Sequence, residues 1–211
     1  MDRVRAWSSM LLVDHCVFRV VHPNLHRVSP SLWRSGQPLP HQVAALAKRG
    51  VRTIVNLRGG REYGSWPLEM HACERHGLEL VDFVVRSREP PSREMVLSSK
   101  RFFDELAYPA LVHCKSGADR AGFFAGLYLM VHEGRPASEA LAQLAPRYGH
   151  FRFAKVGILD AFFDEYRRDG EPRGLSLIEW VERDYDPEAL KRNFRPRFWS
   201  ELIVDRIMRR E

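Results

Sequence analysis

Residues 110–130 read ALVHCKSGADRAGFFAGLYLM and place a cysteine and an arginine six positions apart. An apolar run leads into Cys114, Gly117 follows, and a second apolar run begins after Arg120. This order predicts a buried strand, a tight loop and a helix N-terminus. Such a loop binds anions, because its N–H groups point inward and the helix dipole adds partial positive charge. The same field favours a thiolate, and an arginine binds phosphate oxygens as a fork. The stretch therefore predicts a cysteine nucleophile facing a bound phosphate.

The segment 113–120 resembles the signature loop His-Cys-x5-Arg of the cysteine-dependent protein tyrosine phosphatase superfamily, in particular its small dual-specificity-type bacterial members. The resemblance extends over about residues 25–166. It implies that Cys114 attacks phosphorus, that Arg120 holds the substrate and transition state, and that His113 positions the thiolate. The residues implied to bind the phosphate are His113, Lys115, Ser116, Gly117, Ala118, Asp119 and Arg120. Lys115 either contacts the substrate or is a solvated charge at the rim.

Two positions depart from the usual family pattern. Ala121 stands where most members carry a Ser or Thr, whose hydroxyl helps the thiolate leave, so the second chemical step is expected to be slow or to rely on water. Asp119 precedes the arginine, as in lipid- and inositol-directed branches of the superfamily. A carboxylate there repels a phosphate dianion unless it is protonated or turned away. Asp119 is therefore either a general acid or a hydrogen-bond acceptor that fixes the loop.

The general acid is not evident from the sequence. The family supplies an Asp from the loop before the signature strand, but here the loop 86–92 holds Glu89 as its sole carboxylate. Glu is longer than Asp by one methylene, which general acid catalysis tolerates where the geometry allows. The candidates are Glu89, Asp119, and Asp82 in the middle of the preceding predicted strand. A reaction without a protein acid is the remaining alternative.

Alternating strand and helix patterns predict an α/β fold. We expect a mainly parallel central sheet of four to five strands, flanked by helices, with extra N- and C-terminal helices. The expected strands are 25–28, 32–34, 51–57, 80–85 and 111–113. The expected helices are 40–48, 68–76, 93–106, 121–130, 137–148, 152–167 and 177–185, and a further helix begins at 186–188.

Three parts are expected along the chain. Residues 1–24 form an amphipathic N-terminal helix, residues 25–168 form the phosphatase domain, and residues 169–211 form a helical extension packed on it. The terminal segments either pack on the domain or contact a membrane surface or a partner.

A Gly-rich polar loop follows the strand predicted at 51–57. In α/β sheets the loops after the strand C-termini gather at the ligand site. Arg58 and Arg61 of this loop are therefore expected at the rim of the phosphate pocket. Alternatively, Arg58 anchors the loop by pairing with a carboxylate.

Charge and cysteine usage restrict the partners. The net charge of +6 and the pI of about 9.5 favour anionic substrates or surfaces. No basic run is interleaved with aromatic residues in the manner of a known nucleic-acid-binding module, so nucleic acid is not expected as a partner. The three cysteines have no regular spacing, and a thiolate nucleophile needs a reducing compartment. We therefore expect a cytoplasmic protein, free or peripheral to the inner membrane face.

Neither a cofactor nor a metal is expected. The reaction implied by the resemblance needs none, and the nine histidines are scattered without the spacing of metal ligands. The oligomeric state stays open.

The function implied is a metal-independent phosphomonoester hydrolase with a cysteinyl-phosphate intermediate, most simply a protein tyrosine or dual-specificity phosphatase. A phosphatase of lipid, inositol or sugar phosphates is the first alternative. A catalytically weak phosphate-binding pseudophosphatase is the second, supported by Ala121 and the absent Asp. A rhodanese-like sulfurtransferase fits less well, because its cysteine loop does not require the His-Cys-x5-Arg pattern.

Overall fold

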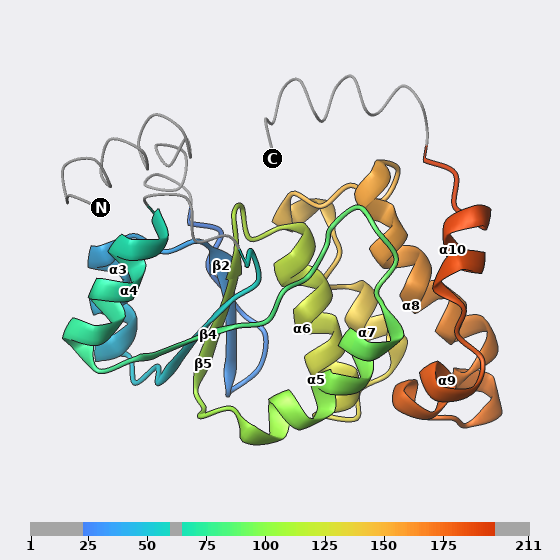
Figure 1. Cartoon of the computed structure of the whole chain (residues 1–211), viewed down its shortest axis with the longest axis horizontal. Helices are drawn as coiled ribbons and strands as arrows, with labels where there is room; N and C mark the ends of the chain where they lie inside the picture. Colours follow the sequence, from blue (N-terminus) through green and yellow to red (C-terminus); the bar gives the residue numbers. More distant parts are fainter. Residues whose placement is uncertain (1–22, 60–64, 197–211) are drawn as a thin grey trace. The chain divides into compact units, whose positions relative to one another are not determined.

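The computed structural model describes residues 23–59 and 65–196, which alternate between strands and helices (Figure 1). The strands are β1 (His26–Arg27), β2 (Leu32–Gly36), β3 (Thr53–Asn56), β4 (Glu79–Asp82) and β5 (Ala110–Cys114). The α-helices are α3 (Pro40–Lys48), α4 (Ser65–His76), α5 (Arg93–Glu105), α6 (Asp119–Val131), α7 (Ala137–Leu141), α8 (Ile158–Asp169), α9 (Leu177–Arg183) and α10 (Pro187–Asn193). The 3-10 turns are η1 (Pro146–Tyr148), η2 (Lys155–Gly157) and η3 (Glu171–Arg173).

Several predictions made from the sequence lie outside the described residues. They are the amphipathic helix within 1–24, the place of Arg61 at a pocket rim, and the surface of the tail from residue 197 onward. Within the described part of the chain, no helix is long and apolar enough to cross a bilayer.

The five strands form one sheet in the order β1-β2-β5-β3-β4. β5 is central and pairs in parallel with β2 on one side and β3 on the other, and β4 pairs in parallel with β3. β1 runs antiparallel to β2. Every residue of β5 is buried, as expected for a central parallel strand. The predicted α/β fold with a mainly parallel sheet is confirmed.

The chain divides into two compact units. The first contains the described residues of 23–85 together with 106–117, and so holds the whole sheet with α3 and α4. The second contains residues 86–105 and the described residues from 118 onward, and so holds α5 to α10. The chain passes between the units inside the signature loop. The boundaries expected after residues 24 and 168 stay predictions.

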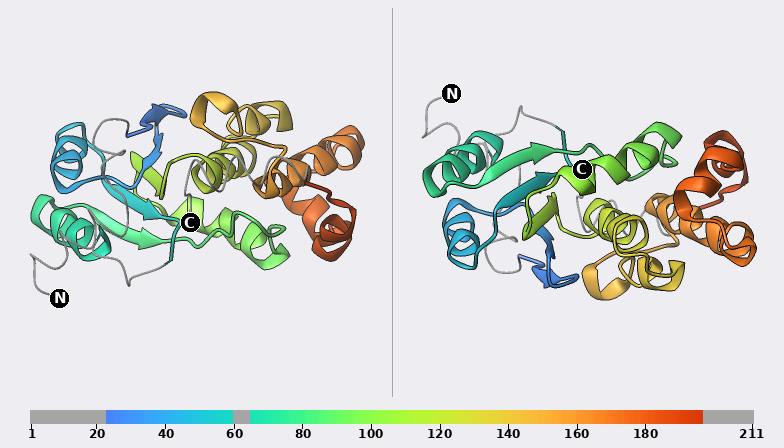
Figure 2. Two further views of the ribbon diagram at one scale, coloured as in Figure 1. Left: turned by 90° about the horizontal axis from the view of Figure 1, so that it is seen from above. Right: turned by 90° about the horizontal axis from the view of Figure 1, so that it is seen from below.

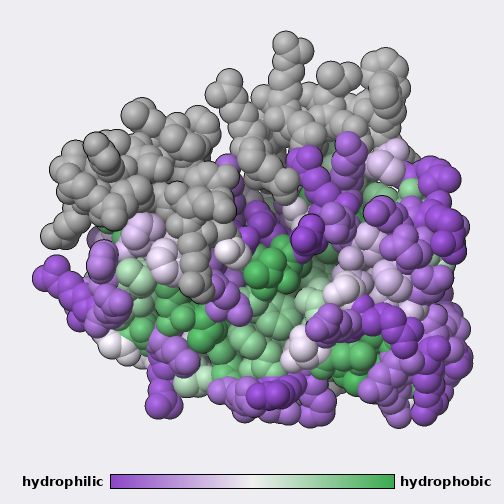
Figure 3. Space-filling view, in the orientation of Figure 1, coloured by the Kyte–Doolittle hydropathy of each residue, from purple (hydrophilic) through white to green (hydrophobic). Residues whose placement is uncertain are grey.

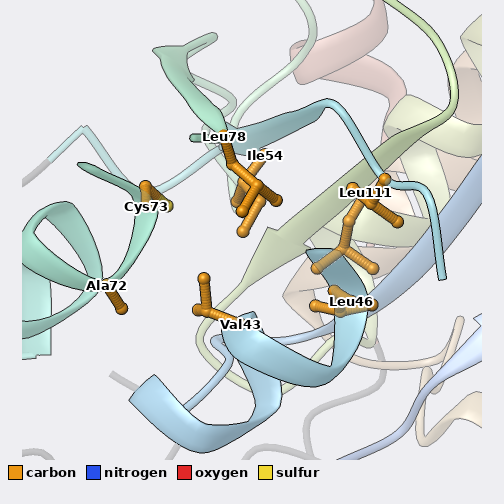
Figure 4. Packing of buried hydrophobic residues seen from close by; sticks show 8 residues of the cluster. Val43, Leu46, Ile54, Ala72, Cys73, Leu78 and Leu111 are labelled. Atoms are coloured by element: carbon orange, nitrogen blue, oxygen red, sulfur yellow. The ribbon is translucent and has the colours of Figure 1, made fainter. Parts of the chain in front are cut away.

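A hydrophobic cluster holds the first unit together. Side chains from α3 and α4 meet side chains from β3 and β5, and those labelled in Figure 4 point toward one another. The two helices lie side by side in the views of Figures 1 and 2. Cys73 of α4 belongs to this cluster, where burial and the charges of Glu69 and Glu74 raise its pKa to about 12. It is therefore an unreactive packing thiol.

The second unit is built around α6, whose residues are buried from Ala121 to Met130. A helix that is apolar on all sides must be covered on all sides. Aromatic rings of α8 pack on it, with Phe123 and Phe163 at 5.1 Å between ring centroids. Trp180 of α9 continues this aromatic cluster. Hydrophilic side chains cover the surface around α9 and α10, at the right of Figure 3.

Local sequence signals explain where several helices start. Ser176 caps α9 and forms a capping box with Glu179. The carboxylate of Asp186 accepts a hydrogen bond from the backbone N–H of Glu188 at the start of α10. Ser92 accepts a hydrogen bond from the backbone N–H of Met95 in α5. These starts were predicted correctly.

Two predicted helices are wrong in extent. The helix expected at 137–148 ends as α7 at Leu141, and Ala145 adopts an extended conformation before Pro146. A residue that precedes proline is driven out of the helical region by a clash with the proline ring. The helix expected from 152 begins only at Ile158, because the chain turns tightly at Gly157, where a Cβ would lie 1.8 Å from a backbone oxygen.

Candidate active site

Cys114 ends the central strand β5 and is buried. Gly36 at the end of β2 pairs with it in register, and Asn56 of β3 pairs with His113. The backbone N–H of Gly117 donates a hydrogen bond to Cys114 Sγ at 3.3 Å. A donor directed at the sulfur solvates negative charge there. The predicted strand that ends at Cys114 is thus present, and the role of Cys114 as a nucleophile stays a prediction.

Gly117 allows the loop to lie against the end of β2. Its φ is +77°, in the left-handed region, and a Cβ at this position would lie 2.5 Å from the backbone N of Gly36 and the backbone C of Ser35. Both the conformation and the contact exclude a side chain. The loop therefore depends on glycine here for two separate reasons.

Two side chains hold the carbonyl groups of the loop. Asn24 Nδ2 donates to the carbonyl of Ser116 at 3.0 Å, and Arg34 Nη2 donates to the carbonyl of Gly117 at 2.8 Å. In a trans peptide the N–H points opposite to the C=O. Fixing these carbonyls therefore fixes the N–H groups of Gly117 and Ala118 on the opposite side of the loop. The sequence analysis assigned no role to Asn24 or Arg34.

A buried polar chain lies behind His113. The Nε2 atom of His113 is 2.9 Å from Oε1 of Glu69, in an approach off the hydrogen-bonding direction, and both side chains are fully buried. Gln37 Nε2 donates to the other oxygen of Glu69 at 2.7 Å, and Arg58 Nη1 donates to the amide oxygen of Gln37. Arg58 thus connects through Gln37 to a carboxylate, which favours the anchoring alternative. Its place at a pocket rim stays a prediction.

A second buried cluster lies at the start of α6, in the other unit. His150 Nδ1 is 2.7 Å from Oδ1 of Asp119, and His150 Nε2 is 2.6 Å from Oδ2 of Asp160. Burial by itself lowers the pKa of His150, but the hydrogen bonds and charges of the two carboxylates outweigh it and raise the pKa to about 9. His150 is therefore an imidazolium at neutral pH. The Asp119 carboxylate makes the contact of a hydrogen-bond acceptor, while its alternative role as a general acid stays a prediction.

The first turn of α6 carries the remaining loop residues. Ala118 is the N-cap, and its methyl group cannot accept a hydrogen bond from the helix. Arg120 is the second helical residue. Ala121 is completely buried and brings no hydroxyl into the loop. Lys115 is half-buried, and its contact with substrate stays a prediction.

The candidate acids lie in different surroundings. Glu89 is exposed, with Oε1 3.5 Å from Arg86 Nη1. Its loop is tied to the segment between α9 and α10, because the hydroxyl of Tyr185 donates to the carbonyl of Pro91 at 2.8 Å. Asp82 was expected in mid-strand, but it is the last residue of β4, since the ladder with β3 ends there. It accepts a hydrogen bond from the Asn56 amide at 2.8 Å.

Over residues 23–59 and 65–196, no group of three or more His, Cys, Asp or Glu side chains could hold a metal ion. The catalytic and binding roles assigned to the individual residues stay predictions.

Comparison with known proteins places the chain in a family. Residues 22–154 match the family model described as a DSP-PTPase phosphatase fused to NAD+ kinase. The dual specificity protein phosphatase TpbA of Pseudomonas aeruginosa is 30% identical over 128 residues, which are 57% of this chain and 53% of TpbA. The chain thus spans about half the length of the curated relatives it matches.

Two solved structures share the fold. The crystal structure of P. aeruginosa TpbA superimposes with a TM-score of 0.51 and 24% identity, covering 80% of this chain and 88% of the chain in that crystal structure. The crystal structure of Tk-PTP in its active form gives a TM-score of 0.54 and 22% identity, covering 70% of this chain and 99% of Tk-PTP. Both likenesses show the phosphatase fold.

The packing of Gly117 predicts a large effect of Gly117→Ala. The matched control is Gly134→Ala, because Gly134 also has a positive φ of +65° but nothing lies within 4 Å of its Cβ position. We expect Gly134→Ala to lower the unfolding free energy by about 1–2 kcal/mol, from the backbone alone. Gly117→Ala should lower it by about 2–5 kcal/mol, because a clash is added. Urea unfolding of both variants measures the difference, and equal losses would contradict the packing argument.

The charge on His150 predicts a pH-dependent contribution to stability. Its pKa of about 9 in the folded protein lies above the ordinary value of 6.5, so the contribution is complete below about pH 6.5 and is lost as the pH rises through 9. The unfolding free energy of wild type minus that of His150→Gln should therefore shrink by about 3 kcal/mol over this range. Urea unfolding at several pH values tests this. A difference that stays constant from pH 6 to pH 9.5 would show that His150 carries no such charge.

Proposed function

The chain belongs to the dual-specificity-type, cysteine-dependent protein tyrosine phosphatase family, and we propose that it hydrolyses phosphomonoesters through a cysteinyl-phosphate intermediate without a metal ion. One observation carries the proposal. Cys114 ends the buried central strand with a loop N–H directed at its sulfur, inside a loop whose carbonyls are held on the other side. A thiolate facing a ring of N–H donors is the arrangement that in-line attack on a phosphate requires.

The proposed reaction has two steps. The Cys114 thiolate attacks phosphorus, an S–P bond forms, and the P–O bond to the leaving group breaks. Arg120 and the loop N–H groups stabilise the equatorial oxygens, and Glu89 gives its proton to the departing oxygen. Water then gives a proton to the Glu89 carboxylate and attacks phosphorus, the S–P bond breaks, and phosphate and the thiolate are released. With Ala121 in place of a hydroxyl, this second step is expected to limit the rate.

The substrate class proposed first is a phosphoprotein. The relative of 30% identity is named a dual specificity protein phosphatase, which supports phosphotyrosine together with phosphoserine or phosphothreonine. The alternative is a lipid, inositol or sugar phosphate, supported by the Gly-Ala-Asp-Arg form of the loop. A panel of phosphopeptides and inositol phospholipids, assayed for phosphate release, separates the two classes. Tight phosphate binding without turnover on any of them would favour the pseudophosphatase alternative.

The nucleophile is tested with para-nitrophenyl phosphate in the presence of EDTA. We expect wild type to release phosphate and Cys114→Ser to lose at least about 10³-fold in kcat, since the nucleophile is removed. Cys73→Ala is the matched control, because Cys73 is a thiol packed in the hydrophobic cluster that has no role in this scheme, and it should retain turnover. Absence of turnover in wild type would contradict the enzyme proposal for activated aryl esters. Turnover in Cys114→Ser would contradict the assignment of the nucleophile.

The general acid is tested with aryl phosphates of increasing leaving-group pKa. We expect Glu89→Gln to lower kcat/KM by about 10²–10⁴-fold for poor leaving groups and little for good ones, because only a basic leaving oxygen needs the proton. Asp119→Asn and Asp82→Asn serve as the comparison variants. If one of these shows the dependence on leaving group instead, that residue is the acid. If all three variants behave as wild type does, none of these three carboxyl groups protonates the leaving group.

A further inference from the structure

The carboxylate of Asp119 lies where a negative charge hinders phosphate binding. Asp119 is the first residue of α6 and directly precedes Arg120 in the proposed phosphate loop. The N–H groups of a helix N-terminus attract anions, and a carboxylate in the first turn competes for them. A fixed negative charge also repels a phosphate dianion. A phosphate-binding loop with this sequence therefore needs something that withdraws or neutralises the carboxylate.

His150 supplies both effects. Its Nδ1 lies 2.7 Å from Asp119 Oδ1, and its side chain is fully buried, so little water screens the pair. Asp160 of α8 fixes the other ring nitrogen at 2.6 Å, so that the ring is held at both ends. A ring with a carboxylate at each nitrogen donates from both and carries a positive charge. The cluster of two carboxylates and one imidazolium then has a net charge of −1 rather than −2.

The direction of the Asp119 side chain fits this role. An aspartate at a helix start commonly accepts hydrogen bonds from the N–H groups of its own first turn. Here the carboxylate is engaged with a ring that lies 31 residues further along the chain, and the N-cap residue, Ala118, makes no side-chain cap. His150 thus holds one oxygen of the Asp119 carboxylate within the second unit, to which both residues belong.

We propose that His150 is a positioning residue for phosphate binding, which draws the Asp119 carboxylate aside and neutralises it so that a phosphate dianion binds at the start of α6. The proposal rests on the function proposed above, because it takes the signature loop as the phosphate site. It assigns the cluster a role in ligand binding beyond its contribution to folding. It also predicts a specific coupling, in which His150 matters to phosphate only while residue 119 carries a negative charge.

A double-mutant cycle tests this coupling. Isothermal titration calorimetry measures the Kd of inorganic phosphate for the full chain as wild type, His150→Gln, Asp119→Asn and the double variant. Gln keeps an amide donor at position 150 without the charge, and Asn keeps an acceptor at position 119. His132→Gln is the matched control, since His132 also lies near a carboxylate, with Nδ1 3.7 Å from Asp104, but directly follows the other end of α6.

We expect His150→Gln to weaken phosphate binding by at least about tenfold, which corresponds to ~1.4 kcal/mol, and His132→Gln to leave it unchanged. In the Asp119→Asn background the same His150→Gln change should cost less than about twofold. Equal weakening in both backgrounds would overturn the proposal, because it would indicate a structural role that does not act through Asp119. No weakening in the wild-type background would overturn it as well.

Circular dichroism establishes whether each variant is folded. If His150→Gln does not fold, Asp119→Asn alone decides, because the proposal requires this variant to bind phosphate as tightly as wild type or more tightly. A weakening by more than about threefold would then overturn it. A wild-type chain that binds no phosphate would contradict the proposed function itself. A wild-type chain that binds phosphate without the expected coupling would contradict this inference alone.

Discussion

The close approach of the signature loop to the end of β2 is the constraint on which the candidate site depends. At Gly117 the loop touches backbone atoms of Ser35 and Gly36, and no side chain fits between them. Arg34, from the same strand, holds the carbonyl of Gly117 from behind. The loop therefore has a rigid support on one side, and its N–H groups are fixed before any ligand arrives. Such preorganisation is what makes backbone donors effective toward a developing charge.

The local part of this arrangement is readable from the sequence, and the distant part is not. The strand, the loop and the helix start are encoded within residues 110–130, and Ser176 and Asp186 mark their helix starts through short-range hydrogen bonds. Residues that act across long sequence distances give no such signal. Gln37 and Glu69 are 32 residues apart, and Asn24 reaches a loop carbonyl 92 residues away. No period or spacing along one chain reveals contacts of this kind.

Arg34 and Gln37 were partly within reach of sequence reasoning. Both lie in the phrase Arg-Ser-Gly-Gln-Pro, residues 34–38, which begins in the last residues of β2 and contains turn-forming residues. A buried arginine directly after an apolar strand residue needs acceptors, and loop carbonyls supply them. His150 offered less, because a histidine beside Gly149 reads as part of an ordinary turn. Its partners come from α6 and α8, so its role emerges only from the packing of these helices.

The C-terminal part of the chain holds the loop that carries the proposed acid. Residues beyond 154 lie outside the match to the family model, yet Tyr185, between α9 and α10, holds the loop that carries Glu89. Arg93 donates to the carbonyl of Tyr185 at 2.8 Å, and the Tyr185 hydroxyl donates back to the carbonyl of Pro91. Two prolines already restrict this loop, and these bonds fix the end that leads into α5. If Glu89 is the acid, as proposed, these bonds keep its loop in one conformation, which lowers the conformational entropy lost when the acid meets a substrate.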